Sequence, residues 1–156
     1  MNGFASGKKL MEVVTTRFGR IQVGREDVIR FPEGLPGLRD CRDFVLLADG
    51  WNTHLAWLQS VARPDIALPV VSPRRYVPRY QPRVARRELE RLEIGDLRAV
   101  RVLSIVGKSP RSVALNLKAP LVINLQRRLG RQVIANGPLP VQYEIPSAAF
   151  LCRRIA

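Results

Sequence analysis

Short apolar runs separated by prolines and glycines are the feature that most limits how this chain folds. The 156 residues include twelve prolines and eleven glycines, which interrupt helices and central strands alike. Between them lie runs rich in valine, isoleucine and leucine, at 13–16, 21–23, 28–31, 44–47, 55–58, 66–71, 100–106, 121–124 and 132–134. Many short strands joined by such turns predict an all-β domain, a mainly antiparallel barrel-like or sandwich fold, and not alternating βαβ units.

Two local patterns refine this prediction. The runs 13–16 and 21–23 flank Gly19, which can take the positive φ that a hairpin turn requires, so they predict a β-hairpin. The run 66–71 contains Pro69, which has no N–H to donate to a neighbouring strand. We therefore expect 66–71 to form an edge strand or a bulge.

One short helix is predicted over 84–94. Leu89 and Leu92 are three residues apart and so share a helix face, and oppositely charged neighbours could form local ion pairs. Gly95 supplies a residue that commonly ends helices. We expect about three turns, capping one end of the sheet.

The length is typical of one domain, and its 46% apolar content suits a globular protein. No apolar segment of signal-peptide length follows Lys8 and Lys9, and no run approaches the length that spans a membrane. Cys41 and Cys152 lie far apart, without metal-ligand or redox spacing. These observations predict a cytoplasmic protein with reduced thiols.

Positive charge is concentrated in the second half of the chain. Residues 1–78 contain eleven Lys/Arg and eight Asp/Glu, whereas residues 79–156 contain fifteen and five. The run from Arg74 to Arg87 holds six arginines and no acid. Two interpretations remain open: a basic patch that binds RNA or DNA, with Tyr76 and Tyr80 stacking on bases, or solvated arginines beside tyrosines that pack on the barrel.

Catalytic machinery is not visible in the sequence. His54 is the only histidine, so a nucleophile–histidine pair would have to be built around it alone. Cys41, Cys152 and His54 do not form a zinc pattern, and no glycine-rich phosphate loop precedes a helix. The sequence predicts a binding protein, not an enzyme, with no cofactor and no metal.

The segment 31–38, Phe-Pro-Glu-Gly-Leu-Pro-Gly-Leu, predicts a stiff structural turn. Pro32 and Pro36 fix φ, while Gly34 and Gly37 permit positive φ. The segment also begins a series of blocks that resembles the FliW family of flagellar assembly factors. The other blocks are 44–47, 57–60, Ser72-Pro73 with Tyr76, Pro78 and Tyr80, 116–124 and 130–134, in the order and spacing of that family.

The resemblance covers about residues 11–146, which leaves 1–10 as a flexible N-terminus and 147–156 as a C-terminal tail. It implies an antiparallel β-barrel-like domain that binds flagellin in the cytoplasm and also binds the RNA-binding regulator CsrA. A FliW-like protein bound to CsrA relieves repression of flagellin translation. Unsecreted flagellin competes for the FliW-like protein and thereby frees CsrA.

We expect partner contacts in three segments, with alternatives for some of their residues. They are the strand end with Trp57, Gln59 and Ser60, the 72–80 loop with Arg74, Arg75, Tyr76 and Tyr80, and Asn124. Trp57 could instead belong to the core, and Asn124 could instead cap a turn.

The charge of this chain departs from the family, whose members are usually acidic at 61–65 and just before 74. Here those segments contain Arg63 and the sequence Ser72-Pro73-Arg74-Arg75. A basic regulator would be repelled by a basic face. Three explanations remain: a partner of changed charge, a mainly apolar contact, or another partner. Flagellin, commonly acidic, would suit a basic surface.

Overall fold

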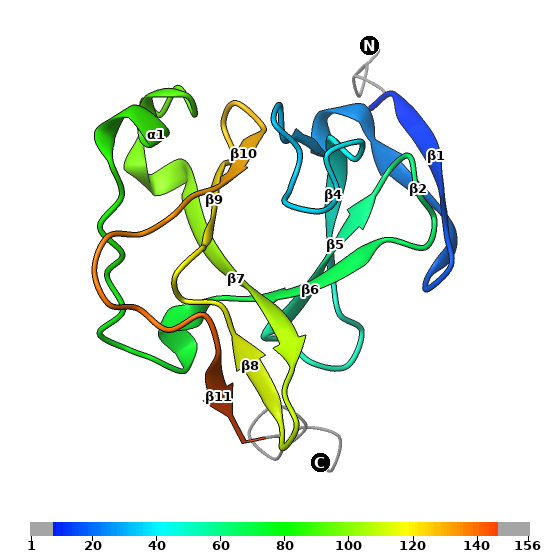
Figure 1. Cartoon of the computed structure of the whole chain (residues 1–156). Coiled ribbons are helices and arrows are strands. Elements are labelled where there is room, and N and C mark those ends of the chain that lie inside the picture. The colour runs from blue at the N-terminus through cyan, green and yellow to red at the C-terminus, as the bar shows by residue number, and fades with distance from the viewer. Residues whose placement is uncertain (1–7, 147–156) are drawn as a thin grey trace.

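The computed structural model describes residues 8–146 (Figure 1). Its strands are β1 (Leu10–Thr15), β2 (Gly19–Gly24), β3 (Val28–Arg30), β4 (Asp43–Ala48), β5 (Leu55–Ser60), β6 (Ala67–Val71), β7 (Val100–Lys108), β8 (Val113–Leu115), β9 (Leu121–Asn124), β10 (Leu129–Gln132) and β11 (Tyr143–Ile145). The helical segments are one α-helix, α1 (Arg86–Glu90), and the 3-10 turns η1 (Arg25–Asp27), η2 (Pro73–Arg75) and η3 (Leu97–Ala99).

Seven strands close into a barrel, which confirms the predicted fold class. Going round the barrel, the order is β3, β4, β5, β6, β7, β9 and β10, and β10 then pairs with β3. All these pairs are antiparallel except β3 with β10, where Leu129 lies opposite Arg30 in a parallel bridge. β8 and β11 extend the sheet outward from β7 (Figure 1). Closure leaves none of the barrel strands β3, β4, β5, β6, β9 and β10 with an open edge, the feature that otherwise promotes aggregation.

The predicted hairpin is present as β1 and β2, outside the barrel. Thr15 lies opposite Gly19, and Gly19 has a φ of 71°, as a three-residue hairpin loop requires. The hairpin packs onto the barrel through a small apolar cluster in which Val13 and Val23 contact Val45 of β4.

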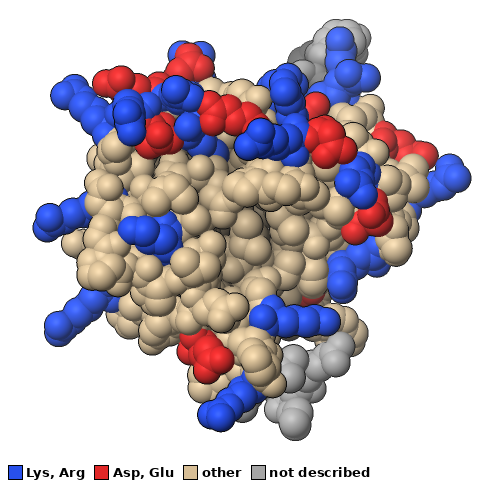
Figure 2. All heavy atoms as spheres, in the orientation of Figure 1, with Lys and Arg blue, Asp and Glu red and all other residues tan. Residues whose placement is uncertain are grey.

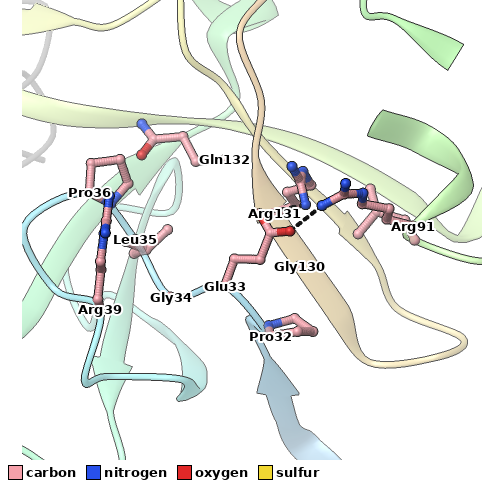
Figure 3. Close-up of a pocket in the computed structure, with 11 residues that line it drawn as sticks. Pro32, Glu33, Gly34, Leu35, Pro36, Arg39, Arg91, Gly130, Arg131 and Gln132 are labelled. Carbon is pink, nitrogen blue, oxygen red and sulfur yellow. Dashed lines mark hydrogen bonds and ion pairs between the residues drawn. The ribbon is translucent and has the colours of Figure 1, made fainter. Parts of the chain in front are cut away.

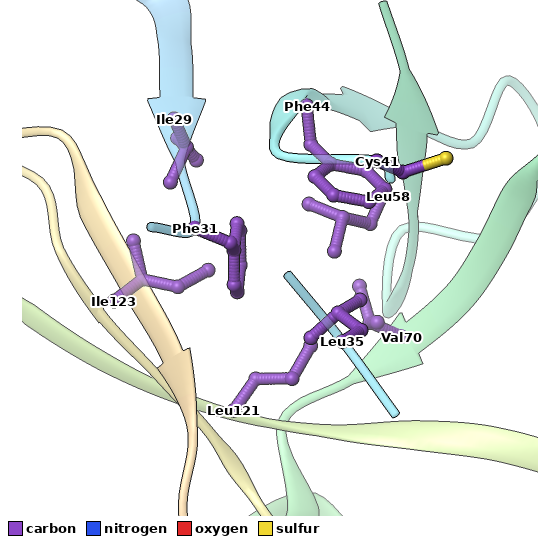
Figure 4. Packing of buried hydrophobic residues seen from close by; sticks show 9 residues of the cluster. All are labelled: Ile29, Phe31, Leu35, Cys41, Phe44, Leu58, Val70, Leu121 and Ile123. Carbon is purple, nitrogen blue, oxygen red and sulfur yellow. The ribbon is translucent and has the colours of Figure 1, made fainter. Parts of the chain in front are cut away.

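The barrel interior is filled by large apolar side chains from almost every strand (Figure 4). Phe31 and Phe44 lie at its centre, with their rings 5.3 Å apart in an edge-to-face arrangement. Gly130 leaves room for the Phe31 ring, because a Cβ at position 130 would lie 2.4 Å from a carbon of that ring. The ring therefore packs directly over the β10 backbone.

Two expectations need correction. The prediction that Pro69 marks an edge strand or bulge is wrong, because β6 lies between β5 and β7. The β6–β7 ladder begins only at Val70, so no β7 partner has to pair with Pro69. The helix is present but shorter than three turns. After Glu90, the chain forms two turns closed by i→i+3 hydrogen bonds, and Glu93 then takes a φ of 51°, which ends the helical path.

The N-terminal boundary expected after residue 10 falls within β1. Leu10 already belongs to β1, and the Lys9 carbonyl oxygen accepts a hydrogen bond from the Arg25 N–H at 2.9 Å. Residues 1–7 and the expected tail 147–156 lie outside the described residues. Cys41 is a buried free thiol, whereas Cys152 also lies outside them. No helix within 8–146 is long and apolar enough to cross a membrane.

Candidate partner-binding surfaces

The Phe31–Leu38 segment forms the stiff turn that its prolines and glycines predict. Gly34 and Gly37 have φ values of 66° and 80°, and a Cβ on Gly34 would lie 2.8 Å from the Arg39 Cα. Leu35 is buried in the barrel core and anchors the turn, while Pro32 and Pro36 are exposed. The turn is therefore fixed to the end of the barrel and does not project from it.

A cleft of about 280 Å³ lies beside this turn, between it, the residues that follow α1, and β10 (Figure 3). We call it the turn cleft; its charged lining residues are Glu33, Arg39, Arg91 and Arg131. The Glu33 carboxylate lies between Arg91 and Arg131, with 2.6 Å between a Glu33 oxygen and a guanidinium nitrogen of Arg131.

Arg131 links the turn to α1, because its other side pairs with Glu88 at 2.5 Å. The side chain of Arg131 is only 16% exposed, so these contacts are partly shielded from water. Hydrogen bonding from Arg131, opposed by desolvation, holds the pKa of Glu33 below its usual range. In the turn cleft, Arg91 and Arg131 pair with acids, and Arg131 joins the turn, α1 and β10.

Gln59 and Ser60 belong to the interior and have no exposed surface. The Gln59 Nε2 donates to the Ser60 carbonyl oxygen at 3.0 Å and to those of Arg63 and Pro64 at 3.4 and 3.3 Å. The Ser60 Oγ accepts a hydrogen bond from the Arg63 N–H at 3.0 Å. Both residues thus hold the 61–65 loop in place from beneath, and a partner of the folded domain does not reach them.

Tyr80 and Asn124 also hold loops from inside. Tyr80 is 4% exposed, and its hydroxyl donates to the Leu117 carbonyl oxygen at 2.7 Å. Burial raises the pKa of Tyr80 to about 12. Asn124 is fully buried; its Nδ2 donates to the Leu92 carbonyl oxygen at 2.9 Å, and its Oδ1 accepts from the Gln126 N–H at 3.1 Å. Asn124 therefore caps turns, as one of the two interpretations of this residue predicts.

Trp57 is half-buried beneath the tip of the β1–β2 hairpin. The Arg17 guanidinium lies 3.9 Å above the centre of its ring, and the Phe18 ring meets it edge-on at 6.1 Å. The indole Nε1 donates to the Asp49 Oδ1 at 3.0 Å. Trp57 therefore joins the hairpin, β5 and the β4–β5 loop.

Asp49 organises the β4–β5 loop. Its Oδ2 accepts hydrogen bonds from the N–H groups of Trp51 and Asn52 at 3.0 and 2.8 Å. The Asn52 Oδ1 in turn accepts from the N–H of His54 at 2.9 Å. This series of hydrogen bonds fixes His54 at the end of the loop, where its Nε2 contacts the Arg75 guanidinium.

A second cleft, of about 480 Å³, opens between this loop and η2; we call it the mouth groove. It is lined by Thr53, His54, Ala56, Val70, Val71, Ser72, Arg74, Arg75 and Leu103. Arg74 and Arg75 are exposed, and the Arg74 Nε donates to the Tyr80 carbonyl oxygen at 3.0 Å. Of the residues predicted as partner contacts, only Arg74 and Arg75 line it, and Tyr76 follows them as a half-buried residue.

The Arg74–Arg87 run extends over η2, the segment 76–85 and the start of α1. Arg83 pairs with Asn136 in an isolated β-bridge, and Arg86 pairs with Glu90 on α1. Figure 2 shows Lys and Arg around the rim of one face, often next to Asp and Glu, and a largely uncharged middle. Because Tyr80 is buried, it is not available to stack on a base, which weakens the interpretation as a nucleic-acid site.

Sequence reasoning did not find several residues that build the two clefts, among them Glu33 and Arg131. Glu33 and Arg131 are far apart in the sequence, and no local pattern links them. Asp49 precedes Gly50, a pair that predicts a turn between the runs 44–47 and 55–58, but the bond from Asp49 to Trp57 requires the barrel. Within 8–146, no group of three or more His, Cys, Asp or Glu lies close enough together to hold a metal ion.

Comparisons with known proteins agree on one family. A family model described as "FliW protein" matches residues 12–145. The flagellar assembly factor FliW of Bdellovibrio bacteriovorus is 40% identical over 126 residues, which cover 80% of this chain and 72% of that protein. The Geobacter sulfurreducens factor is 35% identical over 129 residues, 81% of this chain and 80% of that protein. A solved structure, "Crystal structure of the flagellar assembly factor FliW", matches with a TM-score of 0.79 and 32% identity over 86% of this chain and 96% of that chain.

Proposed function

Because this chain belongs to the FliW family of flagellar assembly factors, we propose that it acts in the cytoplasm by binding flagellin and a CsrA-like translational regulator. The observation that carries the proposal is the match over residues 12–145, which includes the whole barrel and both clefts. A binding role also agrees with the mouth groove, whose lining combines two arginines with apolar side chains.

The activity proposed here is an exchange of partners and needs no covalent step. While bound to this protein, the regulator does not repress flagellin translation. Unsecreted flagellin then competes for the protein and releases the regulator. The response is set by the two affinities and the three concentrations, because each ligand reduces the apparent affinity for the other.

The exposed part of the expected contact surface is the η2 turn, with Arg74, Arg75 and the adjacent Tyr76. An acidic partner such as flagellin suits this surface, since a carboxylate can pair with each guanidinium. A basic regulator would be repelled at the same place. We therefore assign flagellin to the η2 side of the barrel and leave the regulator to another face or to a mainly apolar contact.

Titration calorimetry with the host's own monomeric flagellin and CsrA-like regulator tests the proposal. We expect each to bind the wild-type protein alone, and we expect added flagellin to displace the regulator. Failure of both to bind at moderate salt would overturn the proposal. Binding to a short RNA instead, with affinity that falls steeply as salt rises, would favour the alternative function as a nucleic-acid-binding module.

A further inference from the structure

We infer that the mouth groove is the docking site for a protein segment in which carboxylates flank an apolar side chain. The inference rests on the proposed function and goes further, because it names the place of contact and the chemistry of the segment. Three observations support the inference: the floor of the groove is apolar, its rim is basic, and hydrogen bonds fix its walls.

The floor of the mouth groove is apolar. Val70 and Val71 are buried, and Ala56 and Leu103 are half-buried and pack against the barrel core. The groove lies at one end of the closed barrel, a common position for binding sites in this architecture. An aliphatic or aromatic side chain on this floor would remove apolar surface from water on both partners, at roughly 25 cal/mol per Å².

The rim of the groove is basic. Arg74, Arg75 and His54 line it, and none of its lining residues within 8–146 is acidic. A guanidinium carries five N–H donors, and the Nε–H of Arg74 donates to the Tyr80 carbonyl oxygen. Carboxylates are therefore the groups that this rim recognises best.

The walls of the groove are held in place before a partner arrives. The β4–β5 loop is tied to Trp57 through Asp49, and η2 is tied to Tyr80 through Arg74. A preorganised site loses less conformational entropy on binding than a flexible one. The apolar floor favours a protein segment over single-stranded nucleic acid, and the burial of Tyr80 removes one of the tyrosines that could stack on a base.

Nuclear magnetic resonance gives a direct test, because His54 is the only histidine of the chain and so reports on the groove alone. The probe is the blocked peptide Glu-Glu-Leu-Glu-Glu, with Lys-Lys-Leu-Lys-Lys and a short oligothymidylate as controls. We expect a saturable shift of the His54 ring signals with the acidic peptide only. An equal response to oligothymidylate would show a general anion site, and no response to the acidic peptide would overturn the inference.

Two variants of the mouth groove test the docking site independently of the peptide titration. Arg74→Glu/Arg75→Glu reverses the rim charge, and we expect it to weaken the peptide about tenfold or more. Ser72→Trp fills the groove without removing a charge, and the Ser72 side chain makes no capping hydrogen bond that would be lost. The matched control is Arg86→Glu/Arg87→Glu, which reverses two exposed charges of the same basic run outside the groove.

Flagellin binding separates failure of this inference from failure of the proposed function. If wild-type protein binds flagellin, both groove variants lose flagellin binding and the control variant retains it, the proposed function and the docking site are both supported. If wild-type protein binds flagellin and the folded groove variants bind it equally well, the groove is not the docking site, although the function stands. If the acidic peptide shifts His54 but flagellin does not bind, the proposed flagellin partner is wrong and the groove chemistry stands. Thermal unfolding confirms that each variant is folded.

Discussion

The two clefts lie at opposite ends of the barrel, and both are lined by arginine. The turn cleft follows β3 and lies beside the start of β4, whereas the mouth groove lies where β4 ends and β5 begins. In the turn cleft, Glu33 pairs with Arg91 and Arg131, and Glu88 pairs with Arg131 again. In the mouth groove, the lining arginines are Arg74 and Arg75, and no acid lines it within the described residues.

This difference shows that the number of arginines does not reveal their role. An arginine matched by carboxylates of its own chain satisfies its charge internally and contributes to folding. An arginine whose neighbours are a histidine and a backbone carbonyl keeps a net positive field toward solvent, which favours an acidic ligand. We therefore expect substitutions at the first end to change stability and substitutions at the second end to change binding.

The largest effect is expected where the turn cleft meets the core. Phe31→Ala should lower the free energy of unfolding by about 3–5 kcal/mol, because it opens a large cavity beneath the turn. Gly130→Ala should cost about 1–3 kcal/mol, because its Cβ would overlap the Phe31 ring. The double variant should lose less than the sum, since the new methyl group enters the cavity.

Urea unfolding measures all three proteins. Gly107→Ala is the matched control, because a Cβ there would find its nearest neighbour at 3.9 Å, and we expect a change within about 0.5 kcal/mol. Strict additivity of Phe31→Ala and Gly130→Ala would contradict the packing described for the ring.

A smaller loss of stability is expected for Arg131→Gln, which leaves Glu33 and Glu88 without the arginine that they share. The cost should be about 2 kcal/mol near neutral pH, the range found for hydrogen bonds to charged groups. Arg20→Gln, which breaks the exposed pair with Glu12, is the control and should cost less than about 0.5 kcal/mol. Urea unfolding of both variants tests whether this end of the barrel uses arginine for stability.

The same variant should change the response to acid. The pKa of Glu33 is lower in the folded protein than its usual value, so its ionised form stabilises the fold. This contribution is present above the pKa of the unfolded chain and is lost as the pH falls through the folded pKa. Acidification from about pH 6 to about pH 3 should therefore destabilise wild-type protein more than Arg131→Gln. Equal losses would show that the pair does not set the pKa of Glu33.

At the mouth groove, Asp49→Ala should cost about 1–2 kcal/mol of stability and also weaken binding, since it releases both Trp57 and the loop that holds His54. Trp57→Phe removes the indole hydrogen bond but keeps an aromatic ring under Arg17. It should cost about 1 kcal/mol and weaken binding less than Asp49→Ala, because Asp49 keeps its hydrogen bonds to the loop N–H groups. Calorimetric titration with flagellin compares the two variants, and equal binding losses would mean that the bond to Trp57, not the bonds to the loop N–H groups, positions His54.

The smallest change in stability is expected for Arg75→Gln, within about 0.5 kcal/mol of wild type. Its affinity for flagellin should nevertheless fall several-fold. Arg131→Gln should give the reverse, a clear loss of stability with little change in affinity. If the two substitutions had the same pattern of effects, the proposed division between the ends of the barrel would be wrong.

Much of the fold could be predicted from local patterns. The Gly19 hairpin, the short strands and the turn at 31–38 follow from residue types whose backbone preferences act within a few positions. The Pro69 prediction failed because a proline excludes only the hydrogen bond of its own missing N–H, and the length of the β6–β7 ladder is not a local property.

The candidate site was harder to predict than the fold. Gln59, Ser60, Tyr80 and Asn124 have polar side chains typical of surfaces, yet each is buried and holds a loop through backbone carbonyls or N–H groups. Burial depends on which strands close the barrel, and polar identity alone does not reveal it. Arg74 and Arg75 remained at the surface, where their charge is solvated.

The sequence by itself determined the all-β class, the positions of the sharp turns, the large positive charge and the family to which the chain belongs. These properties depend only on the types of residues and their order in the chain, because backbone preferences act within a few positions. Tertiary structure alone decided which arginines are neutralised, because ion pairs such as Glu33 with Arg131 form only when β10 closes the barrel against β3. It also decided that Arg74, Arg75 and His54 share one apolar groove, because three separate loops and strands meet only at that end of the barrel.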